Sequence, residues 1–377
     1  MSRKNNKNDP NHVWAAIEPN VSSVNESYVS EDLDQTTQHD LSDVSTDHPR
    51  TTEHLTLARS LIEKKYHPVM IFGTQASGKS SMLASLFHYL QNDPRSQAIC
   101  MLGEWILPIE TIEGKTVADA VSRFFNRAVM NFNNGEAVPR TQTDTVPFFI
   151  PVVLRPNNGK PDIRIAFLES SGENYQINAN SASYFPSLKA EVTDVYRNFP
   201  GSLSILVVAP YTLKDAYTDQ EIEQPDDESF HPVDQALYGA LQTYQQERRW
   251  RDMDNYMFVL TKWDVYTGGI SNPEFTNPPN GLVEKVISER YRLSWNFYRS
   301  MPRGGTSNSM QYSAGLISGD GVLQVTDKRH KQAINLFPRA LWNWLYKNAS
   351  GGTALNGPLN NEKKSSGLTS WLKKVLS

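Results

Sequence analysis

The stretch GTQASGKSS, residues 73–81, decides the fold of this chain. It satisfies the pattern G-x-x-x-x-G-K-[ST] through Gly73, Gly78, Lys79 and Ser80. In this pattern the backbone N–H groups of a glycine-rich loop surround the phosphates of a nucleotide, the lysine reaches the terminal phosphates and the hydroxyl can bind Mg²⁺. We therefore expect phosphate contacts along the whole loop: Gly73, Thr74, Gln75, Ala76, Ser77, Gly78, Lys79, Ser80 and Ser81.

The segments on either side of the loop have the required order of strand, loop and helix. HPVMIF before it is an apolar run of strand length. In SMLASLFHYLQ after it, the apolar residues recur at helical spacing: Met82, Leu83, Leu86, Phe87 and Leu90. This context favours a phosphate-binding loop over a glycine turn that merely joins two elements.

Composition narrows the class of protein. The 377 residues are 38% hydrophobic and 10% aromatic, which is enough for a substantial core. A mean hydropathy of −0.52 without a long apolar run argues against a transmembrane helix, and MSRKNNKNDP lacks the apolar region of a signal peptide. Cys100 is the only cysteine, so an internal disulfide is excluded. With a net charge of −4 and no basic stripe, we expect a cytoplasmic protein that does not bind nucleic acid.

The chain predicts four parts. Residues 1–50 are rich in Asn, Ser and Asp and should be disordered, residues 51–348 should form one α/β domain with insertions, and residues 349–366 read as a flexible linker. Residues 367–377 place five apolar side chains on one helical face: Leu368, Trp371, Leu372, Val375 and Leu376. This predicts an amphipathic docking helix for a partner protein, for its own domain or, less readily, for a membrane surface.

The central region alternates strands and helices. VPFFIPVVL and DIRIAFLE are joined only by RPNNGKP, so these strands must run antiparallel. TVADAVSRFFNRAVMNF predicts a helix, and the apolar runs SLSILVVAP (202–210) and NYMFVLTKWD (255–264) suit buried parallel strands. We expect a three-layer α/β fold around a sheet that is mostly parallel with one antiparallel strand.

TKWD, residues 261–264, matches the guanine motif [NT]-K-x-D. Together with the loop it makes the sequence resemble P-loop GTPases of the Ras-like (TRAFAC) class, and bacterial double-GTPase-type domain proteins in particular. The resemblance implies GTP or GDP with Mg²⁺ as cofactors. It implies that Thr261, Lys262 and Asp264 serve the base: the aspartate accepts two hydrogen bonds from guanine and the lysine stem covers the ring.

A second base-side segment, YSAGLIS, resembles the S-A-x loop of the family through Ser313, Ala314 and Gly315. The resemblance implies that the backbone of this loop meets the guanine oxygen. The family usually has lysine where Gly315 stands.

The switch motifs depart further from the family pattern. ESSGEN has Glu169 where the family has an aspartate that holds Mg²⁺ through water, and Gly172 supplies the amide for the γ-phosphate. Glu173 takes the place of a water-positioning glutamine. Thr141 and Thr143 are the candidate switch threonines, Thr141 also as a metal ligand, and Arg140 has the spacing of an internal arginine finger relative to Thr143.

The function expected from these motifs is slow hydrolysis of GTP by a molecular switch, with Lys79, Thr141, Thr143, Glu173 and Arg140 in catalytic roles. Two alternatives stay open: a nucleotide-binding adaptor without turnover, suggested by Glu169 and the missing glutamine, and a P-loop ATPase if TKWD is accidental. The acidic insertion at residues 211–234 and the C-terminal helix are the expected contacts for a protein partner.

Overall fold

The chain divides into two units, Met1–Glu53 and His54–Ser377, and every described residue belongs to the second. The computed structural model describes residues 56–74, 76–96, 98–106, 112–134, 138, 148–156, 160–169, 190–212, 231–301, 307–317, 323–324 and 335–351. The predicted N-terminal tail and the predicted helix at 367–377 lie outside these residues, as does almost all of the predicted linker.

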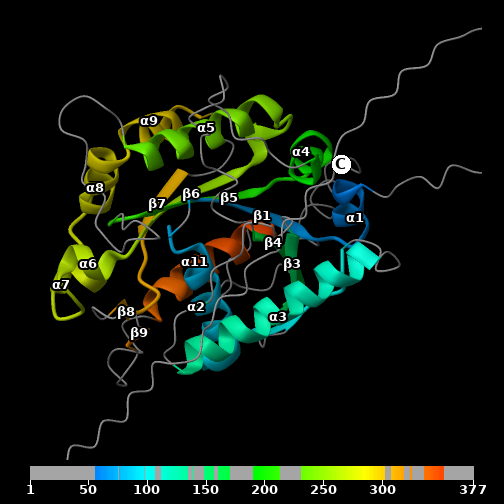
Figure 1. The fold of residues 1–377 in the computed structure, drawn as a ribbon, viewed down its shortest axis with the longest axis horizontal. Coiled ribbons are helices and arrows are strands. Elements are labelled where there is room, and N and C mark those ends of the chain that lie inside the picture. The colour runs from blue at the N-terminus through cyan, green and yellow to red at the C-terminus, as the bar shows by residue number, and fades with distance from the viewer. Residues whose placement is uncertain are drawn as a thin grey trace, which may run out of the picture. The chain divides into compact units, whose positions relative to one another are not determined.

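The described residues form a seven-stranded sheet with the order β2-β3-β4-β1-β5-β6-β7 (Figure 1). Its strands are β1 (His67–Phe72), β2 (Ala98–Leu102), β3 (Phe148–Pro156), β4 (Ile163–Glu169), β5 (Ser204–Pro210), β6 (Asn255–Thr261) and β7 (Ser307–Gln311). Only β3 runs against its neighbours, and β4, β1, β5, β6 and β7 pair in parallel. The expected sheet, mostly parallel with one antiparallel strand, is confirmed. A separate two-stranded ribbon consists of β8 (Leu316–Ile317) and β9 (Leu323–Gln324).

Helices cover both faces of the sheet and complete three layers (Figure 1). One layer holds α2 (Lys79–Asn92), α3 (Ile112–Asn134) and α11 (Leu336–Ala349). The other holds α1 (Leu57–Glu63), α4 (Ala190–Asn198), α5 (Pro232–Glu247), α8 (Leu282–Arg290) and α9 (Arg292–Ser300). Two short helices, α6 (Trp263–Thr267) and α7 (Pro273–Thr276), follow β6, and single 3₁₀ turns are found at Pro94–Ser96 and Arg251–Met253.

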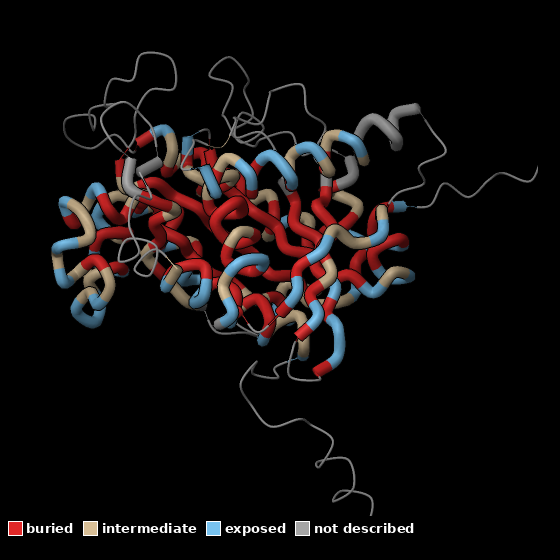
Figure 2. Tube along the Cα trace, turned by 90° about the horizontal axis from the view of Figure 1, so that it is seen from below, coloured by how far each residue is buried: buried red, intermediate tan, exposed pale blue. Residues whose placement is uncertain are grey.

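The central strands are buried because both of their faces carry helices. Every residue of β5 is buried, as is every residue of β1 and β6 after the first. This burial explains their nearly continuous apolar sequences. Figure 2 shows the same contrast between a buried interior and helices that are exposed on their outer turns.

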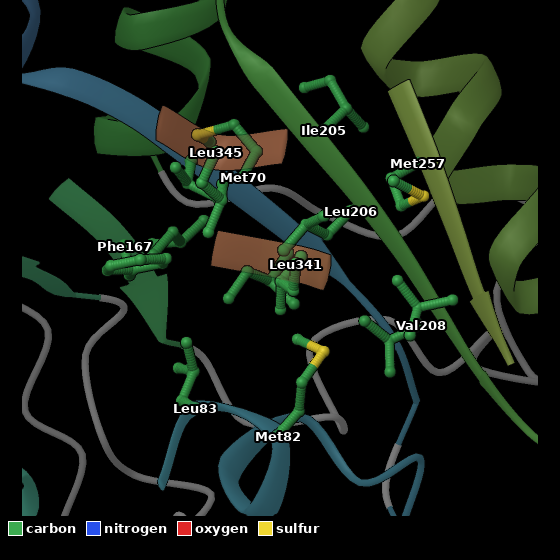
Figure 3. Packing of buried hydrophobic residues seen from close by; sticks show 14 of the residues in the cluster. Met70, Met82, Leu83, Phe167, Ile205, Leu206, Val208, Met257, Leu341 and Leu345 are labelled. Atoms are coloured by element: carbon green, nitrogen blue, oxygen red, sulfur yellow. The ribbon is translucent and has the colours of Figure 1, made fainter. Parts of the chain in front are cut away.

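Helix α11 fills the core beside the phosphate-loop helix (Figure 3). Leu341 and Leu345 lie among Met70 of β1, Phe167 of β4 and Leu83 of α2, all of them fully or almost fully buried. A chain segment near the C-terminus thus joins the strand that carries the loop to the helix that follows it.

Strand β2 lies at one edge of the sheet, and the sequence did not predict this place for it. It pairs antiparallel with β3 so that Cys100 lies opposite Leu154. Ala98 and Cys100 are buried, whereas Ile99 and Met101 on the other face are 50% and 39% exposed. The strand and α3 together lengthen the connection between α2 and β3.

A fully buried ion pair ties the amino ends of β5 and β6 together. Arg248 donates to both carboxylate oxygens of Asp254, with Nε–Oδ2 and Nη2–Oδ1 distances of 2.8 and 2.9 Å, and both side chains are 0% exposed. Asp254 also accepts from the backbone N–H of Leu203 and from the hydroxyl of Tyr244. Arg248 donates further to the carbonyls of Phe199 and Gly201. Both charged groups therefore have several hydrogen-bond partners, although burial still raises the pKa of Asp254.

Candidate nucleotide-binding site

The loop 73–78 joins the carboxyl end of β1 to the N-terminus of α2, and its glycines are required by close packing. A Cβ at Gly73 would lie 2.6 Å from Oγ of Ser77 and 2.9 Å from the carbonyl oxygen of Val208. Gly78 has φ of +88°, and a Cβ there would meet the hydroxyl of Thr261 at 3.3 Å. Ala76 also has a positive φ of 57°. A residue with a side chain would therefore be strained at Gly73 and at Gly78.

Lys79 lies back along this loop. Its side chain is buried, and Nζ donates to the carbonyl oxygens of Gly73 at 2.7 Å and Thr74 at 3.0 Å. The first turn of α2 has no side-chain cap, since its N-cap residue is Gly78. A helix N-terminus without a side-chain cap from its N-cap residue, beside a buried ammonium group, is a favourable place for phosphate oxygens. Ser80, the predicted magnesium ligand, is in the same turn and is partly buried.

The base-side motif lies at the carboxyl end of β6, two strands from β1. Thr261 is the last residue of β6, Lys262 adopts a left-handed conformation with φ of 56°, and Asp264 is buried in the first turn of α6. The left-handed residue turns the chain sharply from strand into helix. This turn brings the Asp264 carboxylate to the edge where the phosphate loop also lies.

Thr261 joins the two loops directly. Its hydroxyl donates to the carbonyl oxygen of Ser77 at 2.6 Å and lies 3.3 Å from that of Ala209. Base motif and phosphate loop are thus connected by a single side chain.

The loop after β7 lies beside the phosphate loop and the loop after β6. Ser313 donates through Oγ to Oδ1 of Asp264 at 2.6 Å and lies 3.1 Å from the carbonyl of Gly315. Tyr312 continues the β6–β7 pairing through a backbone bond to Leu260, and its hydroxyl lies 2.6 Å from Oγ of Ser85 in α2. Burial raises the pKa of Tyr312, so its hydroxyl stays protonated. These contacts hold the loop against both α6 and α2.

Helix α3 reaches the same region from the other side. Ala128 and Phe132 are buried with Ala84 of α2, and Val138 and Ala314 pack against them. Val138 belongs to the loop that leads to the predicted switch threonines. The base-side loop and the start of this loop therefore share one apolar cluster.

The structure brings together most of the predicted site and leaves some of it outside the described residues. The phosphate loop other than Gln75, the TKWD residues and Ser313–Gly315 lie at one edge of the sheet. Glu169 is the last residue of β4, and only its backbone is described. Six predicted residues lie outside the described part of the chain: Gln75, Arg140, Thr141, Thr143, Gly172 and Glu173.

Two contacts at the site could not be read from the sequence motifs. Lys262 extends its Nζ to the carbonyl of Thr212 at 3.1 Å, and Arg290 donates to the carbonyl of Tyr211 at 2.7 Å. A carbonyl partner leaves no trace in residue identity, and Arg290 is distant in sequence from every motif. Arg290 is the last residue of α8, and only the fold brings this end of the helix beside the end of β5.

Among the described residues, no helix has both the length and the apolar character needed to cross a membrane.

Comparison with known proteins gives a limited result. No family model and no curated protein matches the sequence. Among solved structures, the GTPase-like domain of Ski7 from S. cerevisiae is similar in two forms, one bound to GDP and inorganic phosphate and one bound to GTP. Each match has a TM-score of 0.31 and 12% identity over 75% of this chain and 52% of the other. This chain thus spans about half the length of the chains it matches. The fold assignment rests on the strand order and the loop geometry, to which a likeness at this TM-score adds nothing.

Proposed function

We propose that this chain binds GTP and GDP with Mg²⁺, hydrolyses GTP slowly and acts as a cytoplasmic molecular switch. The supporting observation is the placement of Lys79 and Asp264 at one edge of the sheet, with Thr261 joining the two loops through its 2.6 Å bond to the carbonyl of Ser77. In this arrangement the loop would bind the phosphates of a nucleotide, and the buried carboxylate would bind the base of the same nucleotide.

Asp264 provides the selectivity for guanine in this proposal. Its carboxylate would accept hydrogen bonds from the N1–H and the exocyclic amino group of guanine, a pair of donors that adenine lacks. Each charge-assisted bond contributes about 1.5–3 kcal/mol, and adenine would leave the carboxylate without these two donors from the base. Ser313 already occupies Oδ1 as a donor, which keeps the carboxylate oriented.

The loop and Lys79 bind the phosphates in this proposal. Ser80 would hold Mg²⁺, and its oxygen in the first turn of α2 suits a hard cation. Thr141 and Glu169 are the further proposed ligands. When bound, the ion neutralises charge on the phosphates.

Hydrolysis converts GTP and water to GDP and phosphate. Phosphoryl transfer depends mainly on positioning and charge, so no covalent nucleophile is needed. Lys79 would neutralise developing charge, Gly172 would contact the γ-phosphate, and Thr143, Glu173 and Arg140 would order the water or the transition state.

The proposal is tested with the purified full-length chain. The nucleotide that copurifies is identified, and GTP, ATP and xanthosine triphosphate are titrated against the wild type and Asp264→Asn. We expect the wild type to prefer GTP and the variant to gain xanthosine triphosphate binding, because the amide can donate to the xanthine oxygen. A tenfold preference of the wild type for ATP would overturn the proposal in favour of an ATPase.

A second function, a nucleotide-binding adaptor without turnover, is favoured by Glu169 and the missing glutamine. Phosphate release is measured with protein alone and with cell lysate added, using Lys79→Ala as the background. Bound GTP without phosphate release in either case would support the adaptor. The acidic insertion and the C-terminal helix are the proposed contacts for a protein partner in both versions.

A further inference from the structure

The segment Pro210–Thr212 leaves the sheet with all three of its carbonyl oxygens bound by side chains. Tyr291 donates its hydroxyl to the carbonyl of Pro210, Arg290 donates to that of Tyr211 at 2.7 Å, and Lys262 donates to that of Thr212 at 3.1 Å. Lys262 belongs to the base-side motif, whereas Arg290 and Tyr291 form the junction between α8 and α9. Two distant parts of the chain therefore hold the same three residues.

Arg290 holds the side chain of Tyr211 as well as its carbonyl. The guanidinium carbon lies 3.9 Å from the centroid of the Tyr211 ring, close enough for a cation–π contact. The same ring meets Tyr266 of α6 edge-on at 5.1 Å, and Tyr266 stacks on Trp263 at 4.4 Å. Tyr211 is thereby held between α8 and the helix that carries Asp264.

Backbone pairing continues this arrangement into β6. The N–H of Tyr211 donates to the carbonyl of Thr261 at 2.8 Å, directly before Lys262. Thr212 therefore has a defined position relative to Lys262 as long as Tyr211 is held. A lysine side chain loses rotamer entropy when it is immobilised, so a preformed anchor for Nζ favours a single position of its stem.

We propose that Arg290 is a positioning residue for guanine-nucleotide binding: it holds Tyr211, and through it the Thr212 carbonyl that anchors Lys262 beside the base. This inference rests on the proposed function. Arg290 acts on the base side of the site and not on the phosphates, so its effect is the same for GTP and GDP.

A double-mutant cycle with a fluorescent GDP derivative, mant-GDP, tests the proposal in the full chain. The variants are Arg290→Met, Lys262→Met and the two together, with Arg292→Met, an exposed arginine two residues further along, as the matched control. We expect Arg290→Met to weaken binding about five- to tenfold and the double variant to bind no more weakly than Lys262→Met alone, since coupled residues give non-additive effects. Arg292→Met should bind like the wild type, and Arg290→Lys should recover part of the loss.

Additive losses in the cycle would overturn the proposal, as would wild-type binding by Arg290→Met. The wild type and Arg290→Met are also titrated with mant-GTP, and a loss in Arg290→Met that is confined to GTP would overturn the proposal too. Thermal unfolding shows whether each variant is folded, and if Arg290→Met is not, Arg290→Lys replaces it in the same cycle. A wild type that binds no guanine nucleotide would overturn the proposed function itself, and the role of Arg290 with it.

Discussion

Oγ of Ser313 lies 2.6 Å from Oδ1 of Asp264, so the loop after β7 orients the carboxylate that follows β6. Asp264 is buried, with 6% of its surface exposed, so water has little access to compete for its carboxylate. Replacing Ser313 by alanine removes this donor without adding bulk.

Ser313→Ala should weaken GDP binding about tenfold, since a hydrogen bond to a charged group contributes about 1.5–3 kcal/mol and water can replace part of it. Titration with mant-GDP measures the effect, and Ser288→Ala on the surface of α8 is the control. Equal affinity for the wild type and Ser313→Ala would show that Asp264 needs no orientation by this loop.

Much of the fold was predictable because its elements are locally consistent. The apolar runs of β1, β5 and β6 indicate strands buried on both faces, and the short 155–161 connection forces β3 and β4 to be antiparallel. Strand β2 was harder to place, because half of it faces outward and alternation in five residues does not define a partner.

The candidate site was predictable where chemistry requires a residue type at a fixed spacing. Lys79 and Asp264 fall in this group. The hydrogen bond from Thr261 to the carbonyl of Ser77 and the role of Arg290 were not predictable, because both depend on backbone acceptors and on contacts between distant segments.

Lys79→Ala should abolish tight nucleotide binding while the protein stays folded. The ammonium group is the cation of the loop, and it lies within hydrogen-bond distance of the carbonyls of Gly73 and Thr74 and of the hydroxyl of Ser77. Loss of one charge-assisted contact to phosphate corresponds to about 1.5–3 kcal/mol or more at a buried site. Isothermal titration with GDP measures the loss, with Lys285→Ala on the surface as control. Undiminished GDP affinity would remove the assignment of the phosphate loop.

His67 should make the folded protein less stable as the pH decreases. This side chain at the start of β1 lies 2.8 Å from Oγ of Ser204, and burial lowers its pKa to about 4. The unfolded chain takes up the proton near pH 6.5 and the folded chain only near pH 4, so folding loses stability as the pH decreases through this window. The loss from this one residue approaches about 3 kcal/mol at pH 4, and stability is fully present above pH 6.5.

Urea unfolding of the wild type and His67→Gln at several pH values measures this effect. Other groups, including His231 with its lowered pKa, change stability in both proteins, so the difference between the two curves isolates His67. We expect the difference to grow between pH 6.5 and pH 4. Parallel curves would mean that His67 already carries its proton in the folded state or titrates normally.

Replacing only one partner of the buried Arg248–Asp254 pair should greatly lower the free energy of unfolding. Arg248→Met leaves the Asp254 carboxylate without its two guanidinium donors in a site with 0% exposure, and such a loss costs about 3–5 kcal/mol. The double variant Arg248→Met/Asp254→Leu should lose less than the sum of the single variants, because no charge is stranded. Chemical denaturation gives the free energies of unfolding. As a control, Arg155→Met removes an exposed partner of Asp162 and should change little. Additive losses at Arg248 and Asp254 would show that the two charges are not coupled.

Truncation at the C-terminus should separate the folded core from the rest of the chain. Helix α11 ends at Ala349, and Gly351 with φ of +68° follows it. A chain that ends at residue 351 keeps every described residue, so its Tm should stay within about 2 °C of the full chain and GDP binding should be unchanged.

A chain that ends at residue 340 loses four buried side chains of α11: Leu341, Trp342, Leu345 and Tyr346. Removing a large core side chain costs about 2–5 kcal/mol, so the loss of all four costs about 8–20 kcal/mol. This loss is as large as the total stability of about 5–15 kcal/mol that domains of this kind have. This shorter chain should not give a cooperative unfolding transition. If instead the chain ending at 351 aggregates or loses GDP binding, the predicted docking helix at 367–377 belongs to the core. If this chain stays soluble and binds GDP but no longer recruits a partner, the segment is a tethered docking helix.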